Sequence, residues 1–314
     1  MTDAIQAALD KIFQSSRNAV VRVESHDELG KVAGTGFFAD ASGTIYTHSS
    51  AVGDGTDLTV THGDREFPAR LLAKDKRTGI ALVKVEGAGI TPFLVCGDSR
   101  ALKVASPIVV IGYPYDHDLT PSFGIVGGFD RKSKGKFFTT THIRANIPVQ
   151  RGQGGSPVLN LEGEVVGVLV SGFEKESGCY VLPIVAAEKV RSDHERFGDV
   201  RHGWAGVTVQ EIPESVQGSR LAIDVVEPGG PAAAAGFLPG DVVLQVGDIV
   251  VHEPEDALDA AFFLTPGTPV GVRVARGSSI LQIPFTPADH PLERKSGLQA
   301  LGSGSLGSPP AASP

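Results

Sequence analysis

The stretch Gly152-Gln153-Gly154-Gly155-Ser156-Pro157-Val158-Leu159-Asn160, with Gly163-Glu164-Val165-Val166-Gly167 behind it, decides the fold class of this 314-residue chain. Glycines crowd a turn, and apolar, β-branched residues follow in runs of strand length. Similar short runs recur on both sides, separated by turn clusters such as Gly53-Asp54-Gly55. Many short strands at this spacing predict β-barrels rather than a sandwich of long sheets.

Outward from this stretch, the pattern predicts helices and strands in order. An amphipathic helix is expected over residues 3–14, where Ile5, Leu9, Ile12 and Phe13 recur at helical spacing. A second helix, from Ile184 to about Arg196, follows the β-rich region, and Phe197-Gly198-Asp199 has the character of a linker. The expected elements after the first helix are strands at Val20–Val23, Gly36–Phe38, Gly43–Tyr46, Leu58–Thr61, Ile80–Val85, Pro107–Gly112, Phe137–Thr141, Glu164–Ser171 and Cys179–Leu182, then strands at Leu221–Val226, Asp241–Val246 and Val270–Ala275 with a helix over Pro254–Leu264.

Composition excludes several classes of function. Lys and Arg number 28 against 36 Asp and Glu, so the net charge of −8 disfavours a nucleic-acid or anionic-membrane partner. No apolar run approaches the ~18 residues of a membrane span. Two distant cysteines, Cys96 and Cys179, exclude a zinc ribbon and a disulfide scaffold. A G-x-G-x-x-G pattern at 302–307 lacks the flanking strand and helix of a dinucleotide site, so we expect no cofactor.

The first residues, Met1-Thr2-Asp3-Ala4-Ile5, have neither a basic n-region nor an apolar h-region. We therefore expect no signal peptide in this chain. Two interpretations stay open: a cytoplasmic protein, or a sequence that begins after a removed leader.

Several motifs follow one another along the chain: Gly34-Thr35-Gly36-Phe37-Phe38, Gly97-Asp98-Ser99, Ile111-Gly112-Tyr113-Pro114 and the stretch quoted first. Later come Gly203-Trp204-Ala205-Gly206-Val207 and Gly230-Pro231-Ala232-Ala233-Ala234-Ala235-Gly236-Phe237-Leu238-Pro239-Gly240-Asp241-Val242-Val243. This order resembles the HtrA/Deg family of serine proteases over roughly residues 15–286.

The resemblance implies an all-β, trypsin-like double β-barrel followed by a PDZ domain, which is α+β and sandwich-like. The expected division is an N-terminal helix over 1–14, a double-barrel domain over 15–197 and a PDZ domain over 203–290. The Gly-, Ser-, Pro- and Ala-rich tail over 291–314 is expected to be disordered.

The catalytic positions of the family do not match. A serine protease needs a nucleophilic hydroxyl, an imidazole that takes its proton and a carboxylate that orients the imidazole. By resemblance, Ser50 stands where the family has the histidine, Gly79 where it has the aspartate, and Gly154 where it has the serine. We therefore interpret the chain as a pseudoprotease, with no catalytic residues at these degenerate positions.

A rearranged site using His48 and Ser156 is the alternative, and it would make the chain an active endopeptidase. Each residue lies two positions from the place it would need to fill. A two-residue step along a strand moves a side chain by about 6.6 Å, which breaks a ~3 Å nucleophile–base contact. No carboxylate is evident to orient His48, so a polar structural role is favoured for both residues.

Two further sites are considered in the barrels. The backbone of the loop Gly152, Gln153, Gly154 and Gly155 could form a nest of N–H groups that binds a peptide carbonyl, or it could be a simple tight turn. Asp116-His117-Asp118 is a compact trio without metal-ligand spacing, so a solvated loop is favoured and no metal is expected.

The PDZ resemblance implies a peptide groove. PDZ domains add an extended chain to a sheet edge and capture its terminal carboxylate with backbone N–H groups. By resemblance the capturing loop is Trp204, Ala205, Gly206 and Val207, and the groove helix runs near Leu258, Ala261 and Phe262. The alternative is a groove filled by the chain's own segments.

These expectations give a function. The chain is expected to be a catalytically inactive HtrA-like protein that binds peptides, unfolded polypeptides or C-termini as an adaptor, chaperone-like factor or regulator. The family resemblance further implies an active HtrA relative as a partner, a homotrimer and an extracytoplasmic, periplasmic location.

Overall fold

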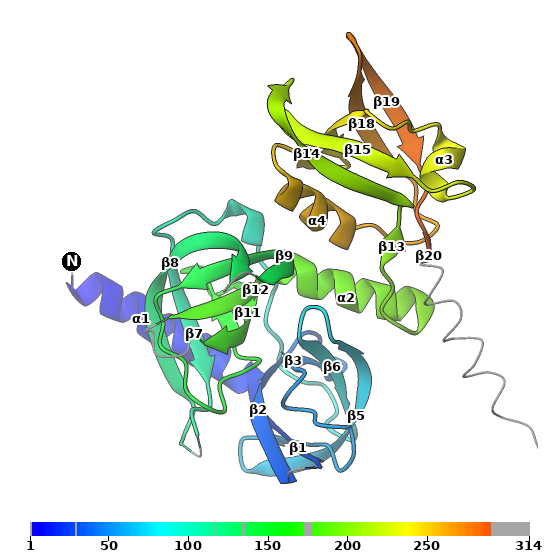
Figure 1. The fold of residues 1–314 in the computed structure, drawn as a ribbon. Coiled ribbons are helices and arrows are strands. Elements are labelled where there is room, and N and C mark those ends of the chain that lie inside the picture. The colour runs from blue at the N-terminus through cyan, green and yellow to red at the C-terminus, as the bar shows by residue number, and fades with distance from the viewer. Residues whose placement is uncertain (1, 29, 116, 134–135, 173–177, 290–314) are drawn as a thin grey trace, which may run out of the picture. The chain divides into compact units, whose positions relative to one another are not determined.

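The computed structural model describes residues 2–28, 30–115, 117–133, 136–172 and 178–289. The chain divides into two compact units, Met1–Val200 and Arg201–Pro314 (Figure 1). The tail over 291–314, which the sequence predicts to be disordered, lies outside the described residues.

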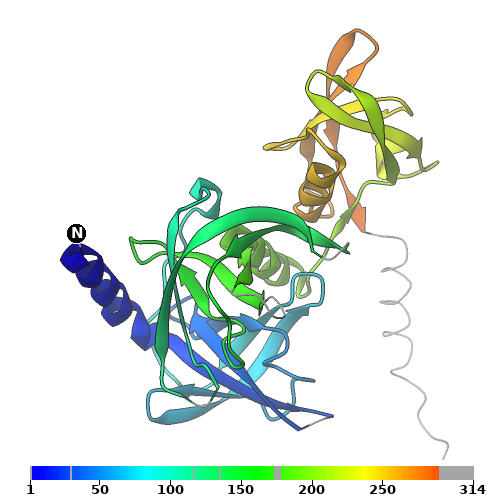
Figure 2. The ribbon, with the colours of Figure 1, turned by 60° about the vertical axis from the view of Figure 1, so that its left-hand side comes forward.

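The first unit contains two closed six-stranded barrels, as the sequence predicts (Figures 1 and 2). Neighbouring strands in both are antiparallel. The first barrel closes in the order β1-β2-β3-β6-β5-β4 and the second in the order β10-β11-β12-β9-β8-β7. The strands are β1 (Val20–Asp27), β2 (Gly30–Phe38), β3 (Thr44–His48), β4 (Thr59–His62), β5 (Arg65–Asp75), β6 (Ile80–Val85), β7 (Pro107–Gly112), β8 (Thr120–Ser133), β9 (Lys136–Ala145), β10 (Pro157–Leu159), β11 (Val165–Gly172) and β12 (Cys179–Pro183).

Each barrel has a core of its own. Alternate side chains of a strand point to opposite faces, so one set from each strand fills the interior. Val23, Phe38 and Ile45 are fully buried in the first core, and Ile108 and Val181 in the second. The 3-10 helices η1 (Arg17–Ala19) and η2 (Ser99–Ala101) lie before the first barrel and between the two.

Three strands of the first unit, β5, β8 and β10, were not predicted. The strand β5 contains Pro68 and five charged residues, which obscure its alternating burial. The strand β8 buries Gly124, Val126 and Gly128 alternately, but glycine gives no apolar signal. Glycine is needed there because a Cβ on Gly124 would lie 2.5 Å from an Ile147 side-chain carbon.

Two helices belong to the first unit. The predicted amphipathic helix is α1 (Thr2–Ser16), which buries Ile12 and leaves Ile5 48 % exposed. In both views α1 extends away from the barrels (Figure 2). The second is α2 (Ile184–Phe197), which ends at Gly198 in the left-handed conformation that favours glycine.

The second unit is a twisted sheet with two helices. Its sheet order is β14-β15-β16-β18-β19, with β17 paired to β16 and a separate pair β13-β20. Leu221, Val243, Val274 and Phe285 are buried in its core. The elements are β13 (Gly203–Trp204), β14 (Val207–Val216), β15 (Ser219–Val226), α3 (Pro231–Ala235), β16 (Val242–Val246), β17 (Ile249–Val250), α4 (Pro254–Phe262), β18 (Val270–Arg276), β19 (Ser279–Phe285) and β20 (Ala288–Asp289).

Candidate functional site

The three degenerate positions meet around one imidazole. His48 ends β3, and Ser50 follows it in the next turn. A Cβ on Gly79 would lie 2.9 Å from His48 Nε2, and a Cβ on Gly154 would lie 3.5 Å from His48 Cβ. The ring of His48 thus lies in the space next to Gly79, where a longer side chain at position 79 would have to begin.

Local backbone structure holds this arrangement. The Gly79 amide donates to the Asp75 carbonyl at 3.0 Å, and φ at Gly79 is +76°. The Ser49 amide donates to the Gly79 carbonyl at 2.7 Å. A left-handed residue without a side chain therefore closes the turn directly against the end of β3.

The His48 imidazole is a poor general base. Burial, with a smaller contribution from the nearby Lys74 charge, lowers the pKa of His48 from 6.5 to about 4. The Ser50 amide donates to His48 Nδ1 at 3.2 Å, and Ser50 Oγ lies 2.7 Å from the same atom. Because glycine faces Nε2, no carboxylate from position 79 orients the ring as a triad requires.

Ser156 does not face the cleft. Its side chain is fully buried, and its Oγ has no hydrogen-bond partner among the described residues. A Cβ on Gly112 would lie 2.0 Å from Ser156 Oγ, so the hydroxyl packs against β7. The structure therefore does not bring His48 and Ser156 together as an accessible nucleophile and base.

Within Gly152–Gly155, two of the four backbone amides are free. The Gln153 amide donates to the Gln150 carbonyl and the Gly155 amide to the Leu169 carbonyl. The amides of Gly152 and Gly154 have no acceptor among the described residues. The expected nest of successive N–H groups over Gly152–Gly155 is therefore corrected to two alternate donors.

The direction of these two amides follows from the peptide planes. In a trans peptide the N–H points opposite to the carbonyl of the same plane. The Arg151 carbonyl accepts from the Tyr115 amide, and the Gln153 carbonyl accepts from the Ser156 amide. The N–H groups of Gly152 and Gly154 point away from these internal partners. Both residues line the cleft, so their amides are available to electronegative oxygens bound there.

One residue that the sequence did not single out fixes this loop. Thr35, on β2, donates from its hydroxyl to the Gly152 carbonyl and from its amide to the Gly154 carbonyl, both at 2.9 Å. The same hydroxyl accepts from the Tyr113 amide at 2.9 Å. The sequence feature that could have indicated this role is a threonine inside an otherwise apolar motif. A hydroxyl buried there needs hydrogen-bond partners.

The cleft itself has a volume of about 320 Å³. It contains His48, Ser50, Gly152 and Gly154 but not Ser156. The remaining lining residues come from β2, β11 and the loop, namely Val32, Ala33, Val149, Gln150, Arg151, Leu169, Val170 and Ser171.

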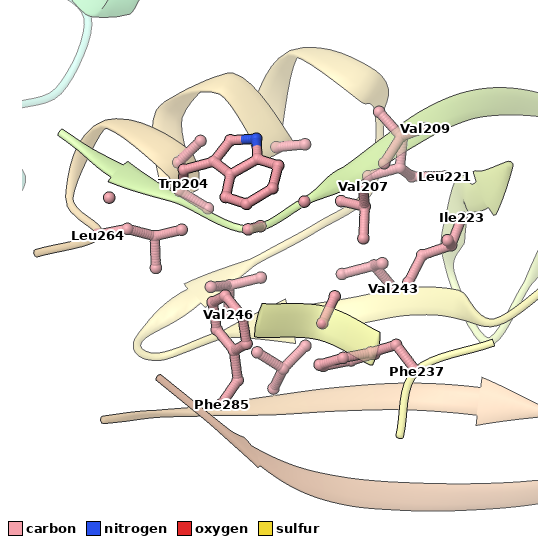
Figure 3. Close-up of a pocket in the computed structure, with 18 of the residues that line it drawn as sticks. Trp204, Val207, Val209, Leu221, Ile223, Phe237, Val243, Val246, Leu264 and Phe285 are labelled. Carbon is pink, nitrogen blue, oxygen red and sulfur yellow. The ribbon is translucent and has the colours of Figure 1, made fainter. Parts of the chain in front are cut away.

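A second cavity, also of about 320 Å³, lies in the other unit between α4 and β14. Figure 3 shows Trp204, at the end of β13, followed by Val207 and Val209 on β14, next to the helix. Six of the seven predicted groove residues line it, namely Trp204, Ala205, Gly206, Val207, Leu258 and Ala261. The floor is apolar and includes residues that the sequence did not assign to the site, among them Leu221, Ile223, Phe237, Leu264 and Phe285.

Phe262, the seventh predicted residue, does not line the groove. Its side chain is 3 % exposed, and its ring lies 5.8 Å from that of His202 and 5.0 Å from that of Phe263. Helical spacing places Pro254, Ala257 and Ala261 on one face, and Phe262 is turned about 100° further round the axis than Ala261.

The loop between β13 and β14 resembles the cleft loop in one respect. The amides of Ala205 and Gly206 have no acceptor among the described residues, whereas both carbonyls accept hydrogen bonds, from Ala232 and Glu227. Gly206 has a φ of +73°, and a Cβ there would lie 3.2 Å from the Trp204 ring and 3.3 Å from Pro231 Cδ. Two free amides therefore lie at one end of an apolar groove.

No metal centre emerges from the described residues, where no group of three or more His, Cys, Asp or Glu side chains converges. Of the trio Asp116-His117-Asp118, the first residue lies outside the described residues, and the His117 carbonyl accepts from Arg22 at 3.1 Å. In the same part of the chain, no helix combines the length and apolar character needed to cross a membrane.

Family models match both units. Residues 34–168 match a trypsin-like peptidase domain, and residues 186–284 match a PDZ domain. These matches confirm the predicted fold class, a trypsin-like double barrel followed by a PDZ domain.

Curated relatives of the chain are described as serine endoproteases. A probable periplasmic serine endoprotease, DegP-like, of Halomonas elongata is 29 % identical over 286 residues, which cover 87 % of this chain and 60 % of the relative. The protein of the same description from Ectopseudomonas mendocina is 31 % identical over 305 residues, covering 93 % of this chain and 63 % of the relative. The chain thus spans less than two thirds of the length of these relatives.

Solved structures share the fold. An HtrA-type protease, AlgW, with a tripeptide has a TM-score of 0.74 at 21 % identity, covering 90 % of this chain and 97 % of that one. A serine endoprotease from Yersinia pestis has a TM-score of 0.65 at 23 % identity, covering 90 % and 98 %. With its trypsin-like peptidase domain and following PDZ domain, the chain belongs to the HtrA/DegP family.

Proposed function

We propose that this chain is a catalytically inactive member of its family that binds polypeptide segments or C-termini. The observation that carries the proposal is the ring of His48, which lies against Gly79 and Gly154 where a triad would need a carboxylate and a nucleophile. Removing the nucleophile or the base of a comparable triad lowers turnover by about 10⁶. Three substitutions at once leave binding as the activity that this site supports.

Two surfaces support binding. In the barrels, the free amides of Gly152 and Gly154 offer two donors to a peptide carbonyl. In the second unit, the Ala205 and Gly206 amides lie at one end of an apolar groove, which suits a terminal carboxylate followed by apolar side chains. Structures of an HtrA-type protease with a tripeptide and with a decapeptide share this fold.

The biological setting belongs to the same proposal. Relatives are named periplasmic endoproteases, so we place this chain outside the cytoplasm. A role as an adaptor, chaperone-like factor or regulator fits a protein that holds polypeptides without cutting them. An active relative as partner and a homotrimeric assembly rest on family kinship.

Hydrolysis of casein tests the inactivity. We expect the purified chain and its Ser156→Ala variant to leave casein equally intact under conditions in which an active trypsin-like enzyme degrades it. Cleavage by the chain that the Ser156→Ala change abolishes would establish the rearranged endopeptidase site instead.

A library of C-terminal peptides, each with a free and an amidated end, tests the binding. We expect the free-acid forms to bind and the amidated forms to bind at least tenfold more weakly, because amidation removes the charge that the two amides receive. Equal binding of both forms would remove carboxylate capture from the proposal.

A further inference from the structure

The groove between α4 and β14 has two distinct ends. At one end, the Gly203 amide donates to the Leu264 carbonyl at 2.9 Å, which brings the C-terminal side of α4 next to the loop of Ala205 and Gly206. At the other end, the Arg220 amide donates to the His252 carbonyl at 2.8 Å. The N-terminal side of α4 therefore lies near the turn that joins β14 to β15.

This polarity sets the path of a bound chain. When the Ala205 and Gly206 amides hold the terminal carboxylate of a peptide, its upstream residues can run in only one direction. They follow the edge strand β14 towards Val216 and α4 towards Pro254. The nine residues of α4 span about 13 Å at 1.5 Å each. An extended peptide advances about 3.3 Å per residue, so roughly four residues reach the far end.

The second unit carries almost all of the chain's net charge. Residues 201–289 contain eleven Asp and Glu against four Arg and no Lys, a formal charge of −7, whereas residues 1–200 have a formal charge of −2. Arg220 pairs with Glu211, Arg276 with Asp241 at 2.7 Å and Arg201 with Asp289 at 3.4 Å. Three of the four arginines are therefore already neutralised by carboxylates.

Two unneutralised carboxylates lie on the far half of β14 and in the first turn of α4. Glu214 is exposed on β14 and has no ion-pair or hydrogen-bond partner among the described residues. It lies between Ile212 and Val216, which pack on the sheet face opposite the groove floor, and a peptide strand added to β14 presents alternate side chains on that face. Glu255, in the first turn of α4, is likewise unpartnered among the described residues and lies one turn before Leu258, a groove residue. Asp256 differs because its carboxylate caps the helix, accepting from the His252 and Glu253 amides.

We propose that the groove selects C-termini that end in an apolar side chain and carry Lys or Arg about three to five residues upstream. The inference rests on the proposed peptide-binding function and names its ligand class. The apolar floor receives the terminal side chain, and the negative far end attracts the cationic one. Acidic peptides of the same length are disfavoured by like-charge repulsion at Glu214 and Glu255.

Fluorescence anisotropy with the whole 314-residue chain tests this. Three labelled decapeptides share the ending Ala-Ala-Val and differ at the fourth to sixth residues from the end, which are all Lys, all Ser or all Glu. We expect the Lys peptide to bind about tenfold more tightly than the Glu peptide at 50 mM NaCl, with the Ser peptide between them. The ratio should fall towards one at 500 mM NaCl because salt screens exposed charges.

Variants assign the effect. Glu214→Lys/Glu255→Lys should reverse the order of the Lys and Glu peptides, whereas Asp224→Asn, an exposed carboxylate on the opposite face of β15 from Ile223, should leave it unchanged. Equal binding of all three peptides by the unmodified chain would overturn the charge selection and leave the proposed function standing. Failure of every free-acid peptide to bind would overturn both.

Discussion

The cleft in the barrels and the groove of the second unit both present free backbone amides, but they differ in how much they depend on particular side chains. Each presents two free amides beside a glycine of the loop, Gly152 and Gly154 in one and Ala205 and Gly206 in the other. In the cleft, the chemistry of a serine protease depends on three side chains, and by resemblance Ser50, Gly79 and Gly154 stand in their places. In the groove, backbone donors and an apolar floor suffice for binding. A function built on backbone and apolar contacts therefore tolerates substitutions that end one built on proton transfer.

The largest expected effect concerns reversion of the cleft. The triple variant Ser50→His/Gly79→Asp/Gly154→Ser restores the family's side chains, yet an Asp Cβ at position 79 would begin 2.9 Å from His48 Nε2. We expect little casein hydrolysis from the triple variant and at least a 100-fold gain on adding His48→Asn, which frees that space. Full activity of the triple variant would show that the His48 ring is no obstacle.

Adding one methyl group at Gly206 should disrupt the loop between β13 and β14. Gly206→Ala forces a Cβ against the Trp204 ring and Pro231 at a positive φ, so we expect peptide affinity to fall at least tenfold and stability to fall by about 1–3 kcal/mol. Anisotropy and chemical denaturation measure the two effects. Gly229→Ala is the matched control, since Gly229 has a similar φ of +72° with open space around it; an equal loss of affinity there would contradict the loop's role.

The stability of the barrel unit, which contains the buried His48, should depend on pH. The folded-state pKa of His48 is lowered to about 4 from 6.5 by burial, so the unfolded chain binds a proton more readily. The contribution of His48 is complete above pH 6.5 and is lost as the pH falls towards 4. We expect urea denaturation to lose about 1–3 kcal/mol more between pH 7 and 4 in the unmodified chain than in His48→Gln. Parallel losses in both proteins would contradict the burial argument.

The smallest effect is expected at Ser156. Its buried hydroxyl has no partner among the described residues, so Ser156→Ala should leave the free energy of unfolding unchanged or raise it by up to about 1 kcal/mol. Thermal denaturation measures it, with Thr35→Val as the contrasting case because the Thr35 hydroxyl makes two hydrogen bonds. A strong destabilisation by Ser156→Ala would point to a partner for this hydroxyl.

Helices and strands were predicted correctly where apolar side chains recur at the helical or the strand spacing. Both barrels, the helices α1, α2 and α4 and most strands with Val- and Ile-rich runs were predicted. The strand β8 was missed because Gly124 and Gly128 occupy buried positions without a side chain. The prediction also missed β14, whose exposed residues give no apolar alternation because one edge and one face stay open.

The candidate site was predictable in its residue types and unpredictable in its details. The motifs placed Ser50, Gly79 and Gly154 at equivalent positions of the family, but no pattern in the chain indicates where the His48 ring points. Phe262 was assigned to the groove because it lies beside Ala261, but the helical step turns it to another face, where it packs against His202 and Phe263. Free and occupied amides in the loop over 150–156 depend on distant acceptors such as the Leu169 carbonyl.

The double tie made by Thr35 has a mechanical consequence. Its residue belongs to the first barrel, while the carbonyls it holds belong to a loop of the second. The orientation of the Gly152 and Gly154 amides thus depends on contacts between the two barrels. A small displacement of one barrel relative to the other would stretch both Thr35 hydrogen bonds together. Such a displacement would turn the amides of Gly152 and Gly154, two residues that line the cleft.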